Sequence, residues 1–218
     1  TRHALGDRTV DWLVVDHYAL DARWEQSLRP ACKRLMVIDD LADSAHDCEL
    51  LLDQNLGRIS EDYSRLVSSD SIVLVGPRYA LLRPEFAQLR TVSLARRTSP
   101  QLKRLLIAMG GVDKDNVTGR VLRALNACDL TSRLHITAVM GPHAPWRQQV
   151  QAQAGQMRWP TQVLVGVSDM ARLMTDSDLA IGAAGGTAWE RCCLGLPSTV
   201  MVLAVNQEAA AEALRKSD

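Results

Sequence analysis

The stretch SDLAIGAAGGTAWERCCLGLP (residues 177–197) contains the pattern of a strand, a turn and a helix, in that order. A short apolar run ends at Gly182, two adjacent glycines follow at Gly185 and Gly186, and an amphipathic segment then carries Glu190. A glycine-rich turn between a strand and a helix is typical of phosphate-binding α/β folds, but a sharp bend alone also favours glycine. The surrounding sequence decides between these two interpretations.

The strand–helix pattern of this stretch repeats over residues 103–218. Runs rich in Val, Ile and Leu alternate with amphipathic segments, and their nearly continuous apolar character is typical of strands buried on both faces of a parallel sheet. The expected strands are 103–111, 134–141, 161–166, 178–182 and 198–204, and the expected helices are 115–127, 145–154, 168–176, 186–195 and 207–216. This alternation predicts an open parallel sheet with helices on both faces.

Residues 1–90 show a shorter series of the same kind. An amphipathic helix is expected between the first two of its strands, and the expected strands are 11–17, 34–40, 49–55 and 71–76. We therefore predict an α/β protein with two Rossmann-like domains, at 1–90 and 103–218, joined by a connection at 91–102. Because the first series opens without its own strand and Gly-rich turn, we expect the N-terminal domain to be incomplete.

The composition excludes several classes of protein. The formal net charge is zero, with both signs interleaved, so no basic surface for nucleic acid is predicted. No apolar run approaches the ~20 residues of a membrane-spanning helix, and the first residues lack the apolar core of a signal peptide. The five cysteines form no CxxC pair, which argues against a zinc site or a disulfide framework and favours a reduced, cytoplasmic protein. The chain has no initiator Met, and we expect it to be a fragment.

Two glycine turns of the second series mark its expected ligand site, because ligands of open α/β sheets bind beyond the carboxyl ends of the strands. Gly110 and Gly111 end the first strand of this series, and Gly185, Gly186 and Thr187 follow the fourth. Each turn precedes a helix whose first N–H groups would be unpaired, so together they predict a cradle for a diphosphate. Neither turn has G-x-G-x-x-G spacing and no Gly-Lys-Ser/Thr occurs, which disfavours an adenine dinucleotide and a P-loop.

Polar side chains in the second series have both functional and structural interpretations. Glu190 lies one turn into the helix that Gly186 begins, where it can accept two ribose hydroxyls or can be an ordinary first-turn glutamate favoured by the helix dipole. Asn206 and Gln207 follow the last strand, and their amides either bind sugar hydroxyls or cap the last helix.

Polar residues also follow the strands of the first series. They form three groups: Asp16, His17 and Tyr18; Asp39 and Asp40; Asp53, Gln54 and Asn55. At one edge of a parallel sheet, these groups predict one wall of a pocket. For His17, a structural hydrogen-bonding role is at least as well supported as catalysis.

Several stretches together resemble a known enzyme family, although each alone is unspecific. They are VVDHYALDARWE (14–25), VIDDLADSAHDCELLLDQN (37–55), GPRYALLRPEF (76–86), MGGVDKDN (109–116), VLVGVSDMARLMTDSDLAIGAAGGTAWERCCLGLP (163–197) and NQE (206–208). This combination resembles the UDP-2,4-diacetamido-2,4,6-trideoxy-β-L-altropyranose hydrolases of pseudaminic acid biosynthesis, which have the glycosyltransferase-B (GT-B) fold. The resemblance implies hydrolysis of a UDP-linked diacetamido sugar to UDP and free sugar, with no metal or other cofactor.

The resemblance also implies roles for individual residues. The uracil is expected near Val167 and Ser168, the diphosphate at Gly111 and the Gly185–Thr187 turn, and the ribose at Glu190. The residues implied to contact the sugar are Asp16, His17, Tyr18, Asn206 and Gln207.

One part of the family pattern is absent from these 218 residues. The family's catalytic histidine lies in a Gly-His-Xaa-Xaa-Arg motif, which does not occur here. Since hydrolysis requires a base that removes a proton from the attacking water, we expect the chain by itself to be inactive or nearly so. Two alternatives stay open: a GT-B glycosyltransferase that uses a UDP-sugar donor, and a non-catalytic nucleotide-sugar-binding module.

Overall fold

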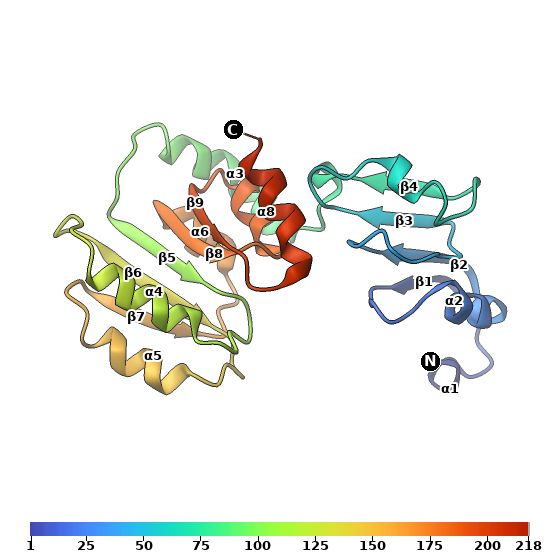
Figure 1. Cartoon of the computed structure of the whole chain (residues 1–218), viewed down its shortest axis with the longest axis horizontal. Helices are drawn as coiled ribbons and strands as arrows, with labels where there is room; N and C mark the ends of the chain where they lie inside the picture. Colours follow the sequence, from blue (N-terminus) through green and yellow to red (C-terminus); the bar gives the residue numbers. More distant parts are fainter. Residues whose placement is uncertain (218) are drawn as a thin grey trace. The chain divides into compact units, whose positions relative to one another are not determined.

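A computed structural model describes residues 1–217, and it confirms an α/β fold with two parallel sheets (Figure 1). The chain divides into two compact units. The first comprises Thr1–Leu81 together with the end of the chain from Glu212, and the second comprises Leu82–Ala211. None of the helices in the described part of the chain is long and apolar enough to cross a membrane.

The first unit contains a four-stranded parallel sheet with the order β1-β2-β3-β4. Its elements are α1 (Arg2–Leu5), β1 (Val10–Val15), α2 (Ala22–Leu28), η1 (Arg29–Ala31), β2 (Cys32–Ile38), β3 (Leu50–Asp53), η2 (Ser60–Tyr63), β4 (Ile72–Val75) and η3 (Pro77–Tyr79). Helix α2 begins where Asp21 accepts hydrogen bonds from the backbone N–H groups of Arg23 and Trp24. All four strands that the sequence predicted for this unit are present, each within a few residues of its predicted bounds.

The core of the first unit lies on one face of this sheet. Leu35, Leu51 and Tyr63 are completely buried there. Trp12 and Val14 occupy the alternate positions of β1 and are exposed, at 43% and 55%. Side chains of a strand point alternately to its two faces, so each apolar run places apolar residues on both faces of the sheet. Helix α2 and the η2 region pack on one of these faces.

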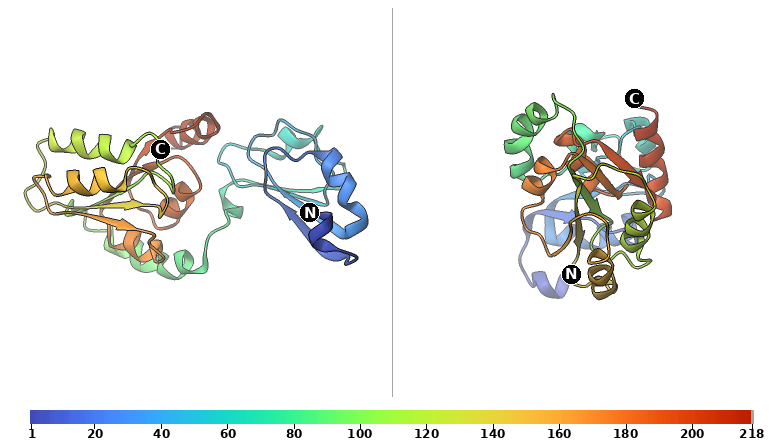
Figure 2. Two further views of the ribbon diagram at one scale, coloured as in Figure 1. Left: turned by 90° about the horizontal axis from the view of Figure 1, so that it is seen from below. Right: turned by 90° about the vertical axis from the view of Figure 1, so that its left-hand side faces the viewer.

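The second unit contains a five-stranded parallel sheet with the order β7-β6-β5-β8-β9. Its strands are β5 (Arg104–Ala108), β6 (His135–Met140), β7 (Thr161–Val165), β8 (Leu179–Ala183) and β9 (Ser198–Met201). Its helices are α3 (Pro84–Arg96), α4 (Val117–Asn126), α5 (Arg147–Ala154), α6 (Met170–Asp176), α7 (Thr187–Cys193) and η4 (Val205–Gln207), and α8 (Glu208–Arg215) continues past Ala211. Helices cover both faces of this sheet, as predicted (Figure 2).

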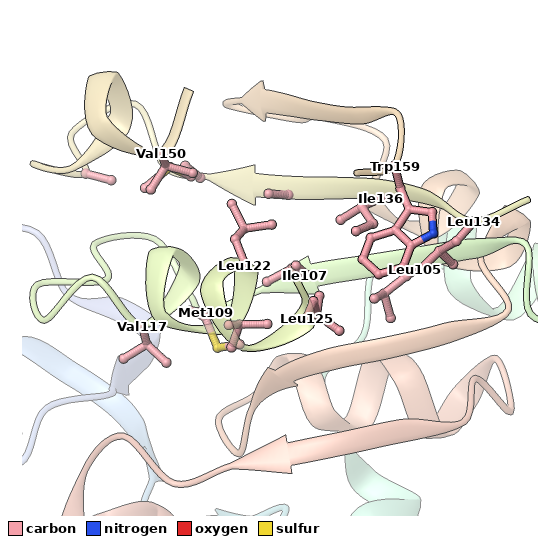
Figure 3. Packing of buried hydrophobic residues seen from close by; sticks show 14 residues of the cluster. Leu105, Ile107, Met109, Val117, Leu122, Leu125, Leu134, Ile136, Val150 and Trp159 are labelled. Atoms are coloured by element: carbon pink, nitrogen blue, oxygen red, sulfur yellow. The ribbon is translucent and has the colours of Figure 1, made fainter. Parts of the chain in front are cut away.

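Alternate residues of the central strand β5 face the two cores of the second unit. Leu105 and Ile107 pack against Leu122 and Leu125 of α4 on one face (Figure 3). Leu106 faces the other side, where it belongs to a cluster with side chains of α3, α6 and α7. The continuous apolar run of β5 is therefore explained by burial on both faces.

The division between the units lies earlier in the chain than the expected connection at 91–102. Residues 91–96 of that segment are instead the end of α3, and all of 91–102 belongs to the second unit. Phe86 is completely buried in the core of this unit, and the Ser93 hydroxyl donates a 2.7 Å hydrogen bond to the Leu194 carbonyl. The basic composition of residues 90–97 suggested a linker. The contacts of Phe86 and Ser93 could not be predicted from it, because their partners lie far away in the sequence.

Candidate functional site

The two glycine turns lie side by side at the carboxyl edge of the second sheet. Gly110 and Gly111 follow β5, and Gly185 follows β8. These strands are direct neighbours, with Ala108 of β5 paired to Gly182 of β8. The structure therefore brings together the two turns that the sequence had placed about 75 residues apart, which is the arrangement expected at the binding edge of an open α/β sheet.

The Gly110–Gly111 turn depends on a third glycine that sequence reasoning missed. Gly110 has a φ of +85°, a left-handed conformation that favours glycine. A side chain on Gly141, which follows β6, would place its Cβ 1.9 Å from the Gly111 carbonyl oxygen. Among the described residues, no atom outside Gly111 and its two chain neighbours lies within 4 Å of the position that a Cβ on Gly111 would take, so this turn is tightly packed at Gly141 and open at Gly111.

The expectation that the helix after Gly111 offers unpaired N–H groups is wrong. Asp113 caps α4: its carboxylate accepts hydrogen bonds from the N–H groups of Val117 (2.7 Å) and Thr118 (2.9 Å). The side chain of Asn116 accepts from Gly119 N–H at 3.1 Å. A capping carboxylate already neutralises the positive end of this helix, so this end does not attract a second anion.

Removing this cap should destabilise the protein without changing its ligand site. For Asp113→Ala we expect a loss of about 1–2 kcal/mol in the free energy of unfolding, because two helix N–H groups lose their acceptor. Urea unfolding measures this loss, and Asp115→Ala, at an exposed position of the same loop, is the matched control. Equal stability of the two variants would show that the cap has no energetic role.

The Gly185–Thr187 turn differs from the capped α4 terminus. Helix α7 has no side-chain cap, and within residues 1–217 the backbone N–H groups of Gly185, Gly186 and Thr187 donate to no acceptor. Unpaired N–H groups that cost free energy when buried are satisfied when an anion binds. Among the described residues the N–H groups of Gly110 and Gly111 also donate to no acceptor, so the two turns differ in the helix that follows: α4 is capped and α7 is not.

Glu190 lies on α7 one turn beyond these donors, with its side chain 18% exposed. Burial raises the pKa of its carboxyl group, although the neighbouring Arg83 and Arg191 act in the opposite direction. Arg83 Nη2 lies 3.8 Å from Glu190 Oε1, and Arg83 Nη1 donates a 3.0 Å hydrogen bond to the Ser168 carbonyl. Arg83 thus joins Glu190 to the Val167–Ser168 loop.

The remaining predicted residues of the second unit lie on η4. The side-chain oxygen of Gln207 accepts a 3.0 Å hydrogen bond from Leu203 N–H, so this oxygen supports the local turn. Gln207 Nε2 would be 3.6 Å from a Cβ on Gly185, which places its NH₂ group beside the glycine turn. Asn206 is exposed. The structure therefore places Gln207 close to the turn.

A cavity of about 540 Å³ lies in the first unit at the carboxyl ends of its strands. The predicted residues that line it are Asp16, His17, Tyr18, Asp39, Asp40 and Gln54. His17 Nδ1 accepts a 3.1 Å hydrogen bond from Ala19 N–H, so a neutral His17 carries its proton on Nε2. Asp53 does not line the cavity: it is completely buried and paired with Arg58 at 2.7 Å.

Asp40 is the carboxyl group of this cavity with an unsatisfied atom. The Tyr18 hydroxyl donates to Asp40 Oδ2 at 2.9 Å, whereas Asp40 Oδ1 is buried and accepts no hydrogen bond in the part of the chain that the structure describes. Burial raises the pKa of Asp40, and the nearby Asp39 adds to this effect despite the Tyr18 hydrogen bond. A ligand N–H or O–H is the group that would satisfy this oxygen.

A buried histidine–carboxylate pair also reaches the cavity, and sequence reasoning missed it. His46 lines the cavity, and its Nδ1 lies 2.7 Å from Glu25 Oε1. Glu25 is completely buried, and its second oxygen accepts from Asp47 N–H at 2.6 Å. Burial lowers the pKa of His46, but the hydrogen bond and charge of Glu25 outweigh burial and leave the pKa raised. The partners are 21 residues apart, so no local motif announces the pair.

This pair should make stability depend on pH. A histidine whose pKa is raised by folding stabilises the protein fully below the unfolded value of about 6.5, and this contribution is lost as the pH rises through the folded-state pKa. We therefore expect the free energy of unfolding to fall between pH 6 and pH 8, and to fall less in His46→Gln. Urea unfolding at both pH values tests this, with the exposed His135→Gln as control. An identical pH dependence in wild type and His46→Gln would contradict the prediction.

The two parallel-sheet units and their strand-end turns define an α/β protein with the GT-B fold. Among solved structures, MurG of Acinetobacter baumannii is similar, with a TM-score of 0.59 and 19% identity over 89% of this chain and 60% of that one. No protein-family model matches the chain.

Among curated proteins, the chain is 26% identical over 206 residues to the UDP-2,4-diacetamido-2,4,6-trideoxy-β-L-altropyranose hydrolase of Campylobacter jejuni. This match covers 94% of the chain and 70% of the hydrolase, and it confirms the resemblance found in the sequence. The chain is also 27% identical to the spore coat polysaccharide biosynthesis protein SpsG of Bacillus subtilis and to the uncharacterized protein MJ1062 of Methanocaldococcus jannaschii. These matches cover 67% and 88% of the chain but only 42% and 40% of the relatives.

Proposed function

We propose that the protein acts on a UDP-linked sugar and that its second unit holds the UDP. The observation that carries this proposal is the combination of three unpaired N–H groups at Gly185–Thr187 with the Glu190 carboxylate one turn further along α7. Free backbone donors suit phosphate oxygens, and a carboxylate suits the two hydroxyls of a ribose. In this proposal the adjacent Gly111 turn also contacts the diphosphate. The Val167–Ser168 loop, which Arg83 ties to Glu190, contacts the uracil.

The sugar contacts in this proposal come from polar residues that follow strands in each of the two units. In the first unit, Asp16, His17 and Tyr18 line a cavity whose carboxylates accept hydrogen bonds. Hydroxyl and acetamido N–H groups are donors, so a diacetamido sugar is chemically suited to this lining. In the second unit, Asn206 and Gln207 are proposed to contact the sugar, with the Gln207 NH₂ group as a donor for its carbonyl or hydroxyl oxygens.

The reaction that we propose for the whole protein is hydrolysis of a UDP-linked 2,4-diacetamido-2,4,6-trideoxy sugar. Water attacks the anomeric carbon, the bond from that carbon to the UDP oxygen breaks, and UDP leaves with this oxygen while a base takes the proton of the water. Similarity to the Campylobacter hydrolase supports this reaction, at 26% identity. Since the chain contains no Gly-His-Xaa-Xaa-Arg motif, we expect the 218 residues alone to bind the nucleotide sugar and to hydrolyse it slowly or not at all.

A GT-B glycosyltransferase is the second candidate, supported by the fold that the chain shares with MurG. The UDP site would serve both activities, which differ in whether water or an acceptor hydroxyl attacks the sugar.

Incubation with the UDP-linked diacetamido sugar in ¹⁸O-labelled water separates these possibilities. Hydrolysis at the anomeric carbon releases UDP without any acceptor and places the label in the free sugar rather than in UDP. UDP release that requires an added acceptor would favour the transferase. Binding without turnover, in this chain and in any longer product of the same gene, would favour a binding module.

A further inference from the structure

Arg191 of α7 is a buried cation that pairs with no carboxylate in the described part of the chain. Its side chain is 2% exposed, and within residues 1–217 it forms no salt bridge. Its Nη2 donates to the Ala183 carbonyl at 2.8 Å, its Nη1 donates to the Thr187 hydroxyl at 3.2 Å, and its Nε is buried without an acceptor. An unpaired buried ion carries a large desolvation cost, so its presence calls for a reason beyond packing.

The two hydrogen-bond partners of Arg191 stand at the two ends of the glycine turn. Ala183 is the last residue of β8, and Thr187 is the first residue of α7. The guanidinium therefore connects the strand to the helix across residues 184–186. Gly182 makes room for it, since a Cβ at this position would lie 2.5 Å from Arg191 Nη1.

The charge of Arg191 adds to the unpaired donors of this turn. The N–H groups of Gly185, Gly186 and Thr187 have no acceptors among the described residues, and the guanidinium is hydrogen-bonded to the Thr187 hydroxyl at the end of the same turn. At the other glycine turn, the Asp113 carboxylate neutralises the helix end. Burial lowers the pKa of Arg191, and an arginine nevertheless stays protonated at neutral pH. The two turns therefore differ in the nearest fixed charge, which is the Asp113 carboxylate at the first and the Arg191 guanidinium at Gly185–Thr187.

We propose that Arg191 is a positioning residue for the diphosphate of UDP: its hydrogen bonds to Ala183 and Thr187 brace the glycine turn, and its guanidinium holds a fixed positive charge next to that turn. This inference rests on the proposed UDP site and goes further by assigning the phosphate specificity to one buried side chain. A nucleoside diphosphate gains from this charge, whereas the uncharged nucleoside uridine does not.

The test is the ratio of UDP affinity to uridine affinity, measured by calorimetry on the full 218-residue chain. For Arg191→Met we expect this ratio to fall about tenfold or more, because the phosphates lose a charge in a low-dielectric setting while the uridine contacts stay. For Arg191→Lys we expect a ratio between those of wild type and Arg191→Met, because lysine keeps the positive charge but cannot form the two hydrogen bonds of the guanidinium. The exposed Arg123→Met on α4 is the matched control and should leave the ratio unchanged. Loss of structure alone would lower both affinities together.

A second variant keeps the test decisive if Arg191→Met does not fold. Gly182→Ala retains the arginine but displaces its guanidinium, so it should also lower the ratio of UDP to uridine affinity. An unchanged ratio in the folded variants would overturn the role of Arg191. A wild-type chain that binds no UDP would instead overturn the proposed UDP site itself.

Discussion

Replacing Glu190 by alanine should weaken UDP binding by about tenfold to a hundredfold. The proposed site gives the Glu190 carboxylate two ribose hydroxyls, and a hydrogen bond to a charged group contributes about 1.5–3 kcal/mol. The side chain is only 18% exposed, so water does not readily replace the lost acceptor. Calorimetry with UDP measures the effect directly.

Two controls isolate the ribose contact of Glu190. Glu85→Ala removes the other carboxylate partner of Arg83, at 3.2 Å, and should leave UDP affinity nearly unchanged. A UDP analogue without the 2′ and 3′ hydroxyls should bind wild type weakly and should bind Glu190→Ala about as well as UDP does. Equal affinity of wild type and Glu190→Ala for UDP would exclude the ribose role.

Replacing Gly141 by alanine should cost about 3 kcal/mol of the free energy of unfolding, at the upper end of what overpacking costs. The new Cβ would lie 1.9 Å from the Gly111 carbonyl oxygen and 3.0 Å from Gly111 Cα. These are backbone atoms, so no side-chain rotation relieves the clash, and the Gly110–Gly111 turn has to move. We therefore expect weaker UDP binding in the protein that remains folded.

A matched glycine substitution should have the opposite sign. Gly155 has helical backbone angles at the end of α5, and a Cβ there would meet its nearest neighbour at 3.5 Å. Gly155→Ala should therefore stabilise the protein by about 0.4–1 kcal/mol, because alanine restricts the unfolded chain. Urea unfolding of both variants decides the matter. A Gly141→Ala protein as stable as wild type would show that the contact with Gly111 is looser than the structure indicates.

The order of strands and helices was predictable because it is encoded locally. Continuous apolar runs such as those of β5 and β8 end in glycine, and amphipathic segments follow them, so their succession predicts a parallel α/β sheet. The ligand edge follows from this topology, and the structure places the Gly111 and Gly185 turns side by side there. The roles assigned to these residues remain predictions for the binding experiments.

The state of each helix end was harder to predict. Asp113 and Asn116 are residue types that cap helices, so the capped N-terminus of α4 had a local signal that the glycine pattern obscured. The boundary between the units near Leu81 had no local signal in the sequence. It depends on the burial of Phe86 against strands and helices that follow later in the chain.

The sequence by itself determined the two-sheet α/β fold, the glycine turns at the strand ends and the place of Glu190 one helical turn beyond Gly186, since each depends on the spacing of neighbouring residues. Only the tertiary structure showed that Gly141 packs on Gly111, that Arg83 joins Glu190 to Ser168, and that Glu25 holds His46 in a cavity. It also showed that Arg191 is buried, donates hydrogen bonds to Ala183 and Thr187, and has no carboxylate partner within residues 1–217. Except at Arg191, the partners in these contacts are far apart in the sequence, and no repeating pattern of residues links them. They meet only when the chain folds, so the sequence pattern could not predict these contacts.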